Sequence, residues 1–298
     1  MQILIAGASG FLGRRLVPHL RQAGHRVIPL VRRPPRPGEV RWDPEAGVLD
    51  GSVVAAADAV VNLAGAGVGD KRWTAQYKKV LLDSRVDSTQ TLARAIAAAP
   101  TKPQVLLNSS AVGYYGDTGD RAVDETSPAG EGFLADLCKV WEAATRPAED
   151  AGTRVALLRT GLPLDREGGL LRPLYLQFRF FAGGRMGSGR QYLPWISVPD
   201  WLDAVSFTLE RELSGPVNLT GPEPVTNAEF SAALARTLHR PNLVPVPGFA
   251  LRAAVGEFGG EALVSQRVMP AVLVREGFRF THQTVDEALQ QAVSSITQ

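Results

Sequence analysis

The sequence predicts an α/β fold, a doubly wound parallel sheet with a smaller C-terminal lobe. Three observations support this prediction. Short aliphatic runs alternate with longer helix-like segments up to about residue 165, a glycine-rich turn follows the first run, and loops rich in glycine and proline dominate after Gly161. Apolar runs this continuous are typical of strands buried on both faces of a parallel sheet. We therefore expect a nucleotide-binding domain over 1–160 and mostly a substrate-side lobe over 161–298, with some segments returning to the first domain.

Five apolar runs predict the strands of the sheet, and three longer segments predict the helices that cover it. The runs are 3–7, 27–31, 59–65, 104–110 and 154–159; the helical segments are Phe11–Ala23, Lys71–Ala98 and Glu131–Ala151. Apolar residues three and four apart within these segments are typical of helices that pack on a sheet. The alternation predicts repeated βαβ units. Further along, Asn227 is the expected N-cap of a helix over Ala228–Leu238, and 243–247 is strand-like.

Composition excludes several classes of protein. Of the 298 residues, 45% are apolar and 21% are charged, which excludes a disordered or fibrous chain. A net charge of +2 gives no reason to expect a nucleic-acid or membrane partner. The single cysteine, Cys138, allows no internal disulfide and fits a reduced compartment, and no signal-like leader or long apolar run stands out, so we expect a cytoplasmic protein. Four scattered histidines predict no metal site.

A glycine-rich turn directly after the first predicted strand is the strongest local signal. The sequence G-A-S-G-F-L-G at 7–13 opens the first helix. Glycines there permit a tight turn and let backbone N–H groups approach a diphosphate at the positive end of the helix, as in Rossmann domains. The alternative is a merely structural turn. The predicted cofactor-binding residues are Gly7, Ser9, Gly10, Phe11, Leu12 and Gly13.

Two arginines at the end of the second strand select the expected cofactor. A protein that binds NAD usually places an acid there for the ribose 2′-hydroxyl. Here Arg32 and Arg33 occupy the place, and no acid occurs between 31 and 38. Guanidinium groups bind phosphate through charge-assisted hydrogen bonds, so the pair predicts NADP(H). The alternative is a pair of solvated loop charges.

Two further strand ends add residues to the expected cofactor site. Ligands of open α/β sheets gather outside the carboxyl ends of the strands. The small residues there would let a cofactor ribose approach, although an ordinary loop is the alternative. The residues are Asn62, Leu63, Ala64 and Gly65 after one strand and Ser109 at the end of another.

Several segments resemble the extended branch of the short-chain dehydrogenase/reductase superfamily, within it the subgroup labelled epimerase family protein. The similar segments are D-K-R-W-T at 70–74, D-S-R-V at 83–86, N-S-S-A-V-G-Y-Y-G at 108–116, L-R-T-G-L at 158–162, G-S-G-R-Q at 187–191 and P-V-T-N-A-E-F at 224–230. The resemblance extends from residue 1 to about 285. It implies a Rossmann core that binds NADP(H), a smaller lobe, and an epimerase or oxidoreductase activity.

The catalytic pair that the resemblance implies is incomplete. The superfamily uses a tyrosine with a lysine four residues later, because a phenol of pKa near 10 needs the ammonium to act as a base near neutrality. Lys139 lies where that lysine belongs, but Ala135 replaces the tyrosine; an exposed surface lysine is the alternative. Ser110 is the predicted substrate-polarising serine, with Ser109 as its substitute, and Tyr115 is the predicted acid/base.

Other residues are expected to contact substrate. Tyr114 is predicted to bind substrate, and both neighbouring tyrosines suit stacking against nicotinamide or substrate as well as acid/base work. Arg190 is predicted to anchor a substrate carboxylate or phosphate, a surface turn being the alternative. Related chains are expected to have a histidine in the segment 195–200, where this chain has Ser197 and Pro199.

Two functions of different classes follow. The first is an NADP(H)-dependent oxidoreductase or epimerase-like enzyme acting on a small polar molecule, a nucleotide sugar being one class. The second is a catalytically retired NADP(H)-binding protein that regulates a partner, suggested by the missing tyrosine–lysine pair. A homodimer is left open, and a scaffold without nucleotide is the least favoured reading.

Overall fold

The structure, a computed structural model, describes residues 1–294, and of residues 252, 254 and 255 it describes only the backbone. The chain forms two compact units. The first consists of Met1–Ser110, Asp136–Arg159 and Val205–Val217, and the second of Ala111–Ala135, Thr160–Ala204 and the described residues from Asn218 onward. The sequence placed one boundary near residue 160 with later segments returning to the first domain; the last four residues of that predicted lobe lie outside the described residues.

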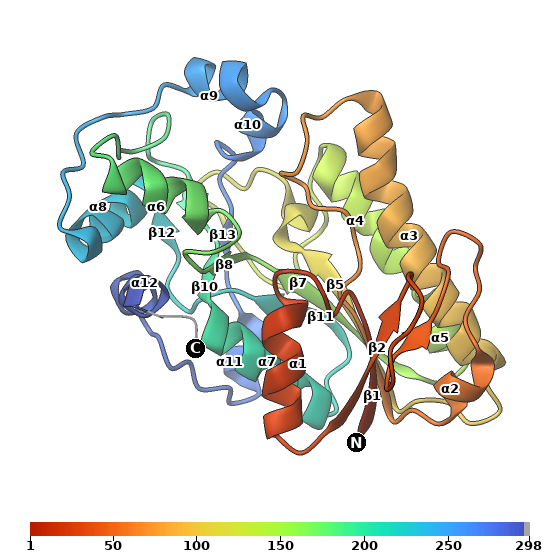
Figure 1. Cartoon of the computed structure of the whole chain (residues 1–298). Helices are drawn as coiled ribbons and strands as arrows, with labels where there is room; N and C mark the ends of the chain where they lie inside the picture. Colours follow the sequence, from red (N-terminus) through yellow and green to blue (C-terminus); the bar gives the residue numbers. More distant parts are fainter. Residues whose placement is uncertain (295–298) are drawn as a thin grey trace. The chain divides into compact units, whose positions relative to one another are not determined.

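A seven-stranded sheet forms the centre of the first unit (Figure 1). Its order is β3-β2-β1-β4-β5-β7-β11, and the pairs β1–β2, β1–β4, β2–β3 and β4–β5 are parallel. The strands are Gln2–Ala6 (β1), Arg26–Val31 (β2), Val40–Arg41 (β3), Ala59–Asn62 (β4), Val105–Ala111 (β5), Arg154–Thr160 (β7) and Gly215–Leu219 (β11). The order reverses between β1 and β4, so the predicted doubly wound parallel sheet is confirmed.

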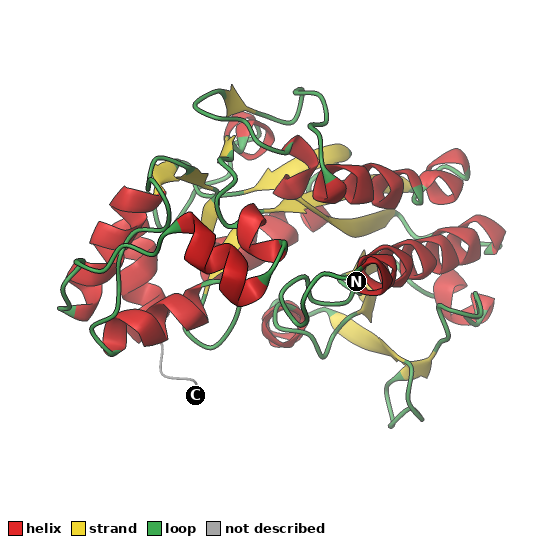
Figure 2. Cartoon of the chain, turned by 90° about the horizontal axis from the view of Figure 1, so that it is seen from above, coloured by secondary structure: helices red, strands yellow, loops and turns green. Residues whose placement is uncertain are grey.

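Helices cover both faces of this sheet, as Figures 1 and 2 show. On one face α1 and α7 lie side by side, with the His19 ring 3.0 Å from the Ser206 hydroxyl. On the other face α3 packs against α5, and the Trp141 indole of α4 donates to Thr89 of α3. The helices are Gly13–Gln22 (α1), Gly51–Ala55 (α2), Ala75–Ala98 (α3), Phe133–Ala143 (α4), Arg146–Asp150 (α5) and Val198–Glu210 (α7).

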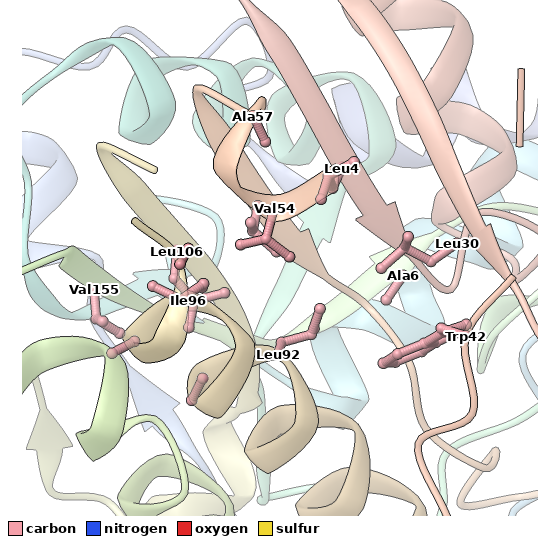
Figure 3. Packing of buried hydrophobic residues seen from close by; sticks show 14 of the residues in the cluster. Leu4, Ala6, Leu30, Trp42, Val54, Ala57, Leu92, Ile96, Leu106 and Val155 are labelled. Carbon is pink, nitrogen blue, oxygen red and sulfur yellow. The ribbon is translucent and has the colours of Figure 1, made fainter. Parts of the chain in front are cut away.

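An apolar core lies between the sheet and α3, on the face that α3, α4 and α5 cover (Figure 3). Leu4 and Ala6 of β1 are fully buried there together with Leu92 and Ile96 of α3. Every residue of β4 is buried, and Ala59, Val60 and Val61 are apolar, as a strand covered on both faces requires. The core fixes α3 on the sheet and so fixes the loop that joins β4 to this helix.

Two predicted helices differ from the observed ones. The segment predicted as one helix over 131–151 is broken into α4 and α5, because Pro147 has no N–H to continue the ladder and instead lies in the first turn of α5. The helix predicted from Lys71 begins at Ala75, because Thr74 caps it by accepting a hydrogen bond from the Tyr77 amide.

The second unit contains three two-stranded sheets and its own apolar core. The pairs are β8–β10 and β6–β13, both parallel, and β9–β12, antiparallel. Phe178 of α6, Phe230 of α8 and Leu289 of α12 are among the residues of the core. The elements are Val112–Tyr115 (η1), Ala122–Val123 (β6), Leu162–Leu164 (β8), Leu171–Arg179 (α6), Tyr192–Leu193 (β9), Trp195–Ser197 (β10), Val225–Thr226 (β12), Asn227–Leu238 (α8), Gly248–Val255 (α9), Phe258–Glu261 (α10), Arg267–Val268 (β13), Ala271–Arg275 (α11) and Val285–Ser294 (α12).

Two local predictions for this unit are wrong. The N-cap of α8 is Thr226 and not Asn227: the Thr226 hydroxyl accepts from the Glu229 amide, and the Glu229 carboxylate accepts from Thr226 in return. Asn227 is buried, and its side-chain Oδ1 accepts instead from the Met186 amide. The strand-like run at 243–247 forms only one bridge, between Val246 and Met186. Across residues 1–294, no helix is both long and apolar enough to cross a bilayer.

Candidate functional site

The glycine turn after β1 has a conformation that only glycine suits. Gly7 has a φ of +80°, and a Cβ on it would lie 2.6 Å from the carbonyl carbon and oxygen of Leu63. A Cβ on Gly13 would lie 2.2 Å from the Gly7 carbonyl oxygen. The first glycine therefore lets the turn approach the loop after β4, and the last lets α1 start directly above the turn.

The first turn of α1 offers donors without acceptors. No side chain caps the helix at Leu12, and its first turn contains no acidic residue. Within residues 1–294, the amides of Phe11 and Leu12 donate to no protein group. Ser9 and Gly10 beside them are exposed. Free N–H groups at the positive end of a helix form a binding site for an anion.

The loop after β4 contributes its backbone, but Asn62 itself is enclosed. Its side chain is fully buried, donates to Thr89 and Asn108, and accepts from the Ala64 amide. Asn62 was predicted to touch the cofactor; its contacts instead make it a support that holds the loop. Leu63 and Ala64 are half-buried, and Gly65 is exposed.

These two loops meet at the point where the strand order reverses. β1 and β4 are neighbours, and the Gly7 turn touches Leu63 and Ala64 across their carboxyl ends. In open α/β sheets, ligands bind in the crevice at this switch point. The predicted phosphate loop and the predicted ribose loop therefore form one continuous surface in the first unit.

The arginine pair after β2 has a partner that the sequence did not predict. Arg33 holds Glu39 through two hydrogen bonds, Nη1–Oε2 at 2.7 Å and Nη2–Oε1 at 2.6 Å. The hydrogen bonds from Arg33 and from the Arg36 amide lower the pKa of Glu39 to about 2. Glu39 directly follows the stretch 31–38, which contains no acid. Arg32 is exposed and free of any ion pair in the described part of the chain.

Ser110 is committed to a buried ion pair. Its hydroxyl donates to Glu142 Oε1 at 2.6 Å. Arg159 donates to the same carboxylate through Nε and its Nη2, both at 2.8 Å, and the side chains of Arg159 and Glu142 are only 4% and 10% exposed. The Ser110 proton therefore points at a carboxylate, which gives no support to the predicted role as substrate donor. The hydroxyl of Ser109, half-buried, has no protein partner within residues 1–294.

The predicted acid/base, Tyr115, is enclosed in the second unit. Only 2% of it is exposed, and its hydroxyl donates to Asn218 Oδ1 at 2.8 Å. Asn218 in turn donates through its amide to Glu125 and through its side chain to the Met269 carbonyl. A phenol tied into such a network holds the loop together, so the acid/base role has no structural support. Tyr114 is half-buried and packs edge-on against Tyr115.

The remaining predicted groups lie on surfaces. Lys139 is 46% exposed and pairs with Asp136 at 2.6 Å, one turn away on α4, so it is a surface lysine rather than half of a catalytic pair. Arg190, in the second unit, is exposed, and its amide donates to the Ser188 hydroxyl. His282 is half-buried, and its ring Nδ1 lies 3.0 Å from the Ser197 hydroxyl, which donates to Asp200. Residues 1–294 contain no cluster of histidine, cysteine and acid that could hold a metal ion.

Comparisons with known proteins agree with this geometry. Residues 3–139 match the model of the NAD dependent epimerase/dehydratase family, and 246–292 match a domain of unknown function. An epimerase family protein of Mycobacterium leprae is 48% identical over 99% of this chain and 97% of its own length. Another from Bacillus subtilis is 35% identical over 99% of this chain and 98% of its own. The crystal structure of human epimerase family protein SDR39U1 with NADPH is 33% identical, with a TM-score of 0.91, over 99% of this chain and 100% of that one.

Proposed function

Because the chain belongs to the NAD-dependent epimerase/dehydratase family, we propose that it binds NADP(H) and catalyses hydride transfer with a small polar molecule. One observation carries the proposal. Three features adjoin at the switch point of the sheet: the Gly7 turn, the loop after β4, and the amides of Phe11 and Leu12, which donate to no group within residues 1–294. That combination suits a diphosphate and the ribose beside it.

The residues present fit this cofactor. The space that a Cβ would fill at Gly7 or Gly13 is already taken by backbone, so the turn is shaped to expose its amides. Arg32 and Arg33 would hold a 2′-phosphate, and the human relative that was crystallised with NADPH supports this choice over NAD(H). Arg33 would have to exchange Glu39 for the phosphate, a second anion that guanidinium groups bind through the same kind of paired hydrogen bonds; the two side chains of the ion pair are 47% and 17% exposed.

The bound nicotinamide would supply or accept hydride. The chain's own residues then have to orient the reacting oxygen and move its proton. Ser109 keeps an uncommitted hydroxyl at the carboxyl end of β5, whereas Ser110, Tyr115 and Lys139 are each engaged elsewhere. We therefore assign substrate orientation to Ser109 and leave proton transfer to a water or to the substrate's own groups.

Turnover tests this proposal directly. Wild-type protein is mixed with NADPH and a panel of aldehydes, ketones and nucleotide sugars, and absorbance of the reduced nicotinamide is followed. We expect oxidation with at least one compound, and none with Gly13→Ala, in which the added Cβ would lie 2.2 Å from the Gly7 oxygen. If the protein binds NADPH tightly but oxidises it with no compound of the panel, the proposed hydride transfer is contradicted.

A second candidate is a cofactor-dependent binding protein without turnover. It is favoured by the commitment of the expected catalytic groups: Ser110 to Glu142, Tyr115 to Asn218, and Lys139 to Asp136. It predicts a partner that is captured by NADPH-loaded protein and not by Gly13→Ala. Equal capture by both would refute it.

A further inference from the structure

An arginine on α3 has a buried donor and no acid to neutralise it. Arg85 donates through Nη1 to the Leu81 carbonyl at 3.0 Å, and its guanidinium carbon lies 5.1 Å from the centre of the Trp141 ring. Its Nε is buried without a hydrogen-bond partner, and its Nη2 has none within residues 1–294. In the same range Arg85 forms no ion pair.

The surroundings of Arg85 do not compensate for the free energy that burying its charge costs the folded state. Burial lowers the pKa of Arg85, and the two side chains with the largest opposing effect are the thiol of Cys138 and the phenol of Tyr77. Neither is a carboxylate, and the Tyr77 hydroxyl already donates to the Gly67 carbonyl. A guanidinium stays charged in proteins, and a desolvated charge without a counterion destabilises the native state.

The unpaired edge of Arg85 is the edge through which Arg159, in the same unit, binds a carboxylate. Arg159 holds Glu142 through the same two atoms, Nε and Nη2, each 2.8 Å from one carboxylate oxygen. Side-by-side N–H groups of this kind match two oxygens of a carboxylate or a phosphoryl group. In Arg85 the equivalent pair has no acceptor in the described part of the chain.

The guanidinium lies against the loop of the proposed cofactor site. A Cβ on Gly65 would lie 3.2 Å from Cγ and 3.3 Å from Cζ of Arg85. Gly65 is exposed, and Arg85 itself is half-buried, so the guanidinium lies directly beneath a surface residue that has no side chain. The charge is therefore next to the switch point, on the side of α3 and α4.

We propose that Arg85, flanked by Trp141 and Gly65, is a binding site for an oxyanion, a carboxylate or phosphoryl group carried by the substrate. The assignment of the anion to the substrate rests on the proposed function; the anion site itself does not. Trp141 would hold the guanidinium plane by a cation–π contact while its free edge meets the anion. The substrate is then an acid or a phosphorylated molecule rather than a neutral one.

The first arm of the test needs no cofactor. Inorganic phosphate and acetate are titrated into wild type, Arg85→Met, Arg85→Lys and Arg94→Met, the last an exposed arginine on the same helix. Binding is followed by tryptophan fluorescence. The contribution of Trp141 is the part of the signal change that is missing in Trp141→Phe. We expect about tenfold or greater weakening in Arg85→Met, partial retention in Arg85→Lys, and no change in Arg94→Met. Equal binding by wild type and Arg85→Met would overturn the site.

A folding control accompanies this arm. If Arg85 serves an anion, Arg85→Met unfolds at the same or a higher urea concentration than wild type, because an uncompensated charge is removed. If Arg85 serves only packing on Trp141, Arg85→Met unfolds earlier and phosphate binding does not differ, which contradicts the proposal.

The second arm distinguishes the substrate from the cofactor as the source of the anion. Phosphate is titrated by calorimetry into protein saturated with NADPH. If the anion belongs to the substrate, phosphate still binds to the NADPH-saturated protein. The affinity of Arg85→Met for NADPH then stays within about twofold of that of wild type. If NADPH blocks phosphate and binds Arg85→Met about tenfold more weakly, the anion belongs to the cofactor and the substrate assignment is wrong. Absence of NADPH binding to wild type would refute the proposed function, while the first arm still decides the anion site.

Discussion

Replacing Arg159 by methionine tests the buried ion pair that holds Ser110. The substitution keeps most of the side-chain volume but leaves the Glu142 carboxylate, only 10% exposed, with the Ser110 hydroxyl as its one remaining donor among residues 1–294. Removing one partner of a buried pair destabilises a protein by about 3–5 kcal/mol. For a large domain this corresponds to a fall in Tm of about 6–20 °C.

The assay is urea and thermal unfolding followed by circular dichroism, with two controls. Arg236→Met breaks an exposed pair of similar geometry, in which Arg236 and Asp286 are 62% and 43% exposed, and should cost less than about 1 kcal/mol. Replacing both Glu142 and Arg159 by methionine removes both charges and should recover all but about 2 kcal/mol.

The result that refutes this reasoning is specific. If Arg159→Met and Arg236→Met unfold at the same urea concentration and temperature, the buried Glu142 carboxylate does not depend on Arg159. The commitment of Ser110 would then lose its basis, and Ser110 would again be a candidate to polarise substrate.

Three further predictions concern other parts of the chain. Gly13→Ala should abolish NADPH binding in calorimetry, because its Cβ would lie 2.2 Å from the Gly7 oxygen. Saturable binding by the variant would contradict the role of the glycine turn in holding the diphosphate. Glu39→Gln should tighten NADPH binding a few-fold and leave NADH binding unchanged, because Arg33 no longer has to leave a carboxylate; equal effects on both cofactors would refute the competition. Burial raises the pKa of Glu125, so the folded state binds its proton more strongly than the unfolded state, and this carboxyl lowers stability as pH rises through that pKa. Glu125→Gln should therefore unfold later than wild type at pH 8, with the advantage shrinking toward pH 5, and a pH-independent difference would show that the charge is not the cause.

The sheet and the glycine turn could be predicted because their signals are local. Strands buried on both faces are mostly apolar, and Ala59, Val60 and Val61 of β4 are fully buried. Gly7 and Gly13 are required by a single turn and the helix after it. The sequence therefore places the glycine turn correctly, directly after the first strand and before the first helix, without any knowledge of distant residues.

The catalytic predictions depended on partners far away in the sequence. Ser110 and Glu142 are 32 positions apart, and Tyr115 and Asn218 are 103 apart. A serine at a strand end and a tyrosine in a glycine-flanked loop look alike whether they face a substrate or a buried acceptor. Only the fold shows which acceptor each one has.

Some errors were local and avoidable. Glu39 follows the arginine pair closely enough to reach Arg33 through a turn, and Pro147 marks a break in the predicted helix. Thr226 with Glu229 three residues later is a capping-box pattern that outranks the neighbouring Asn227. Arg85 lies in the segment D-S-R-V at 83–86, but the sequence gives no sign that one edge of its guanidinium is unpaired.

Calorimetric titration of NADPH and of NADH, with wild type and with a variant in which Arg32 and Arg33 are both alanine, tests the central claim most directly. The account predicts one saturable site per chain, a preference of about 10- to 100-fold for NADPH, and loss of that preference in the variant with NADH affinity unchanged. No saturation with either cofactor, or a preference that survives loss of both arginines, would contradict it.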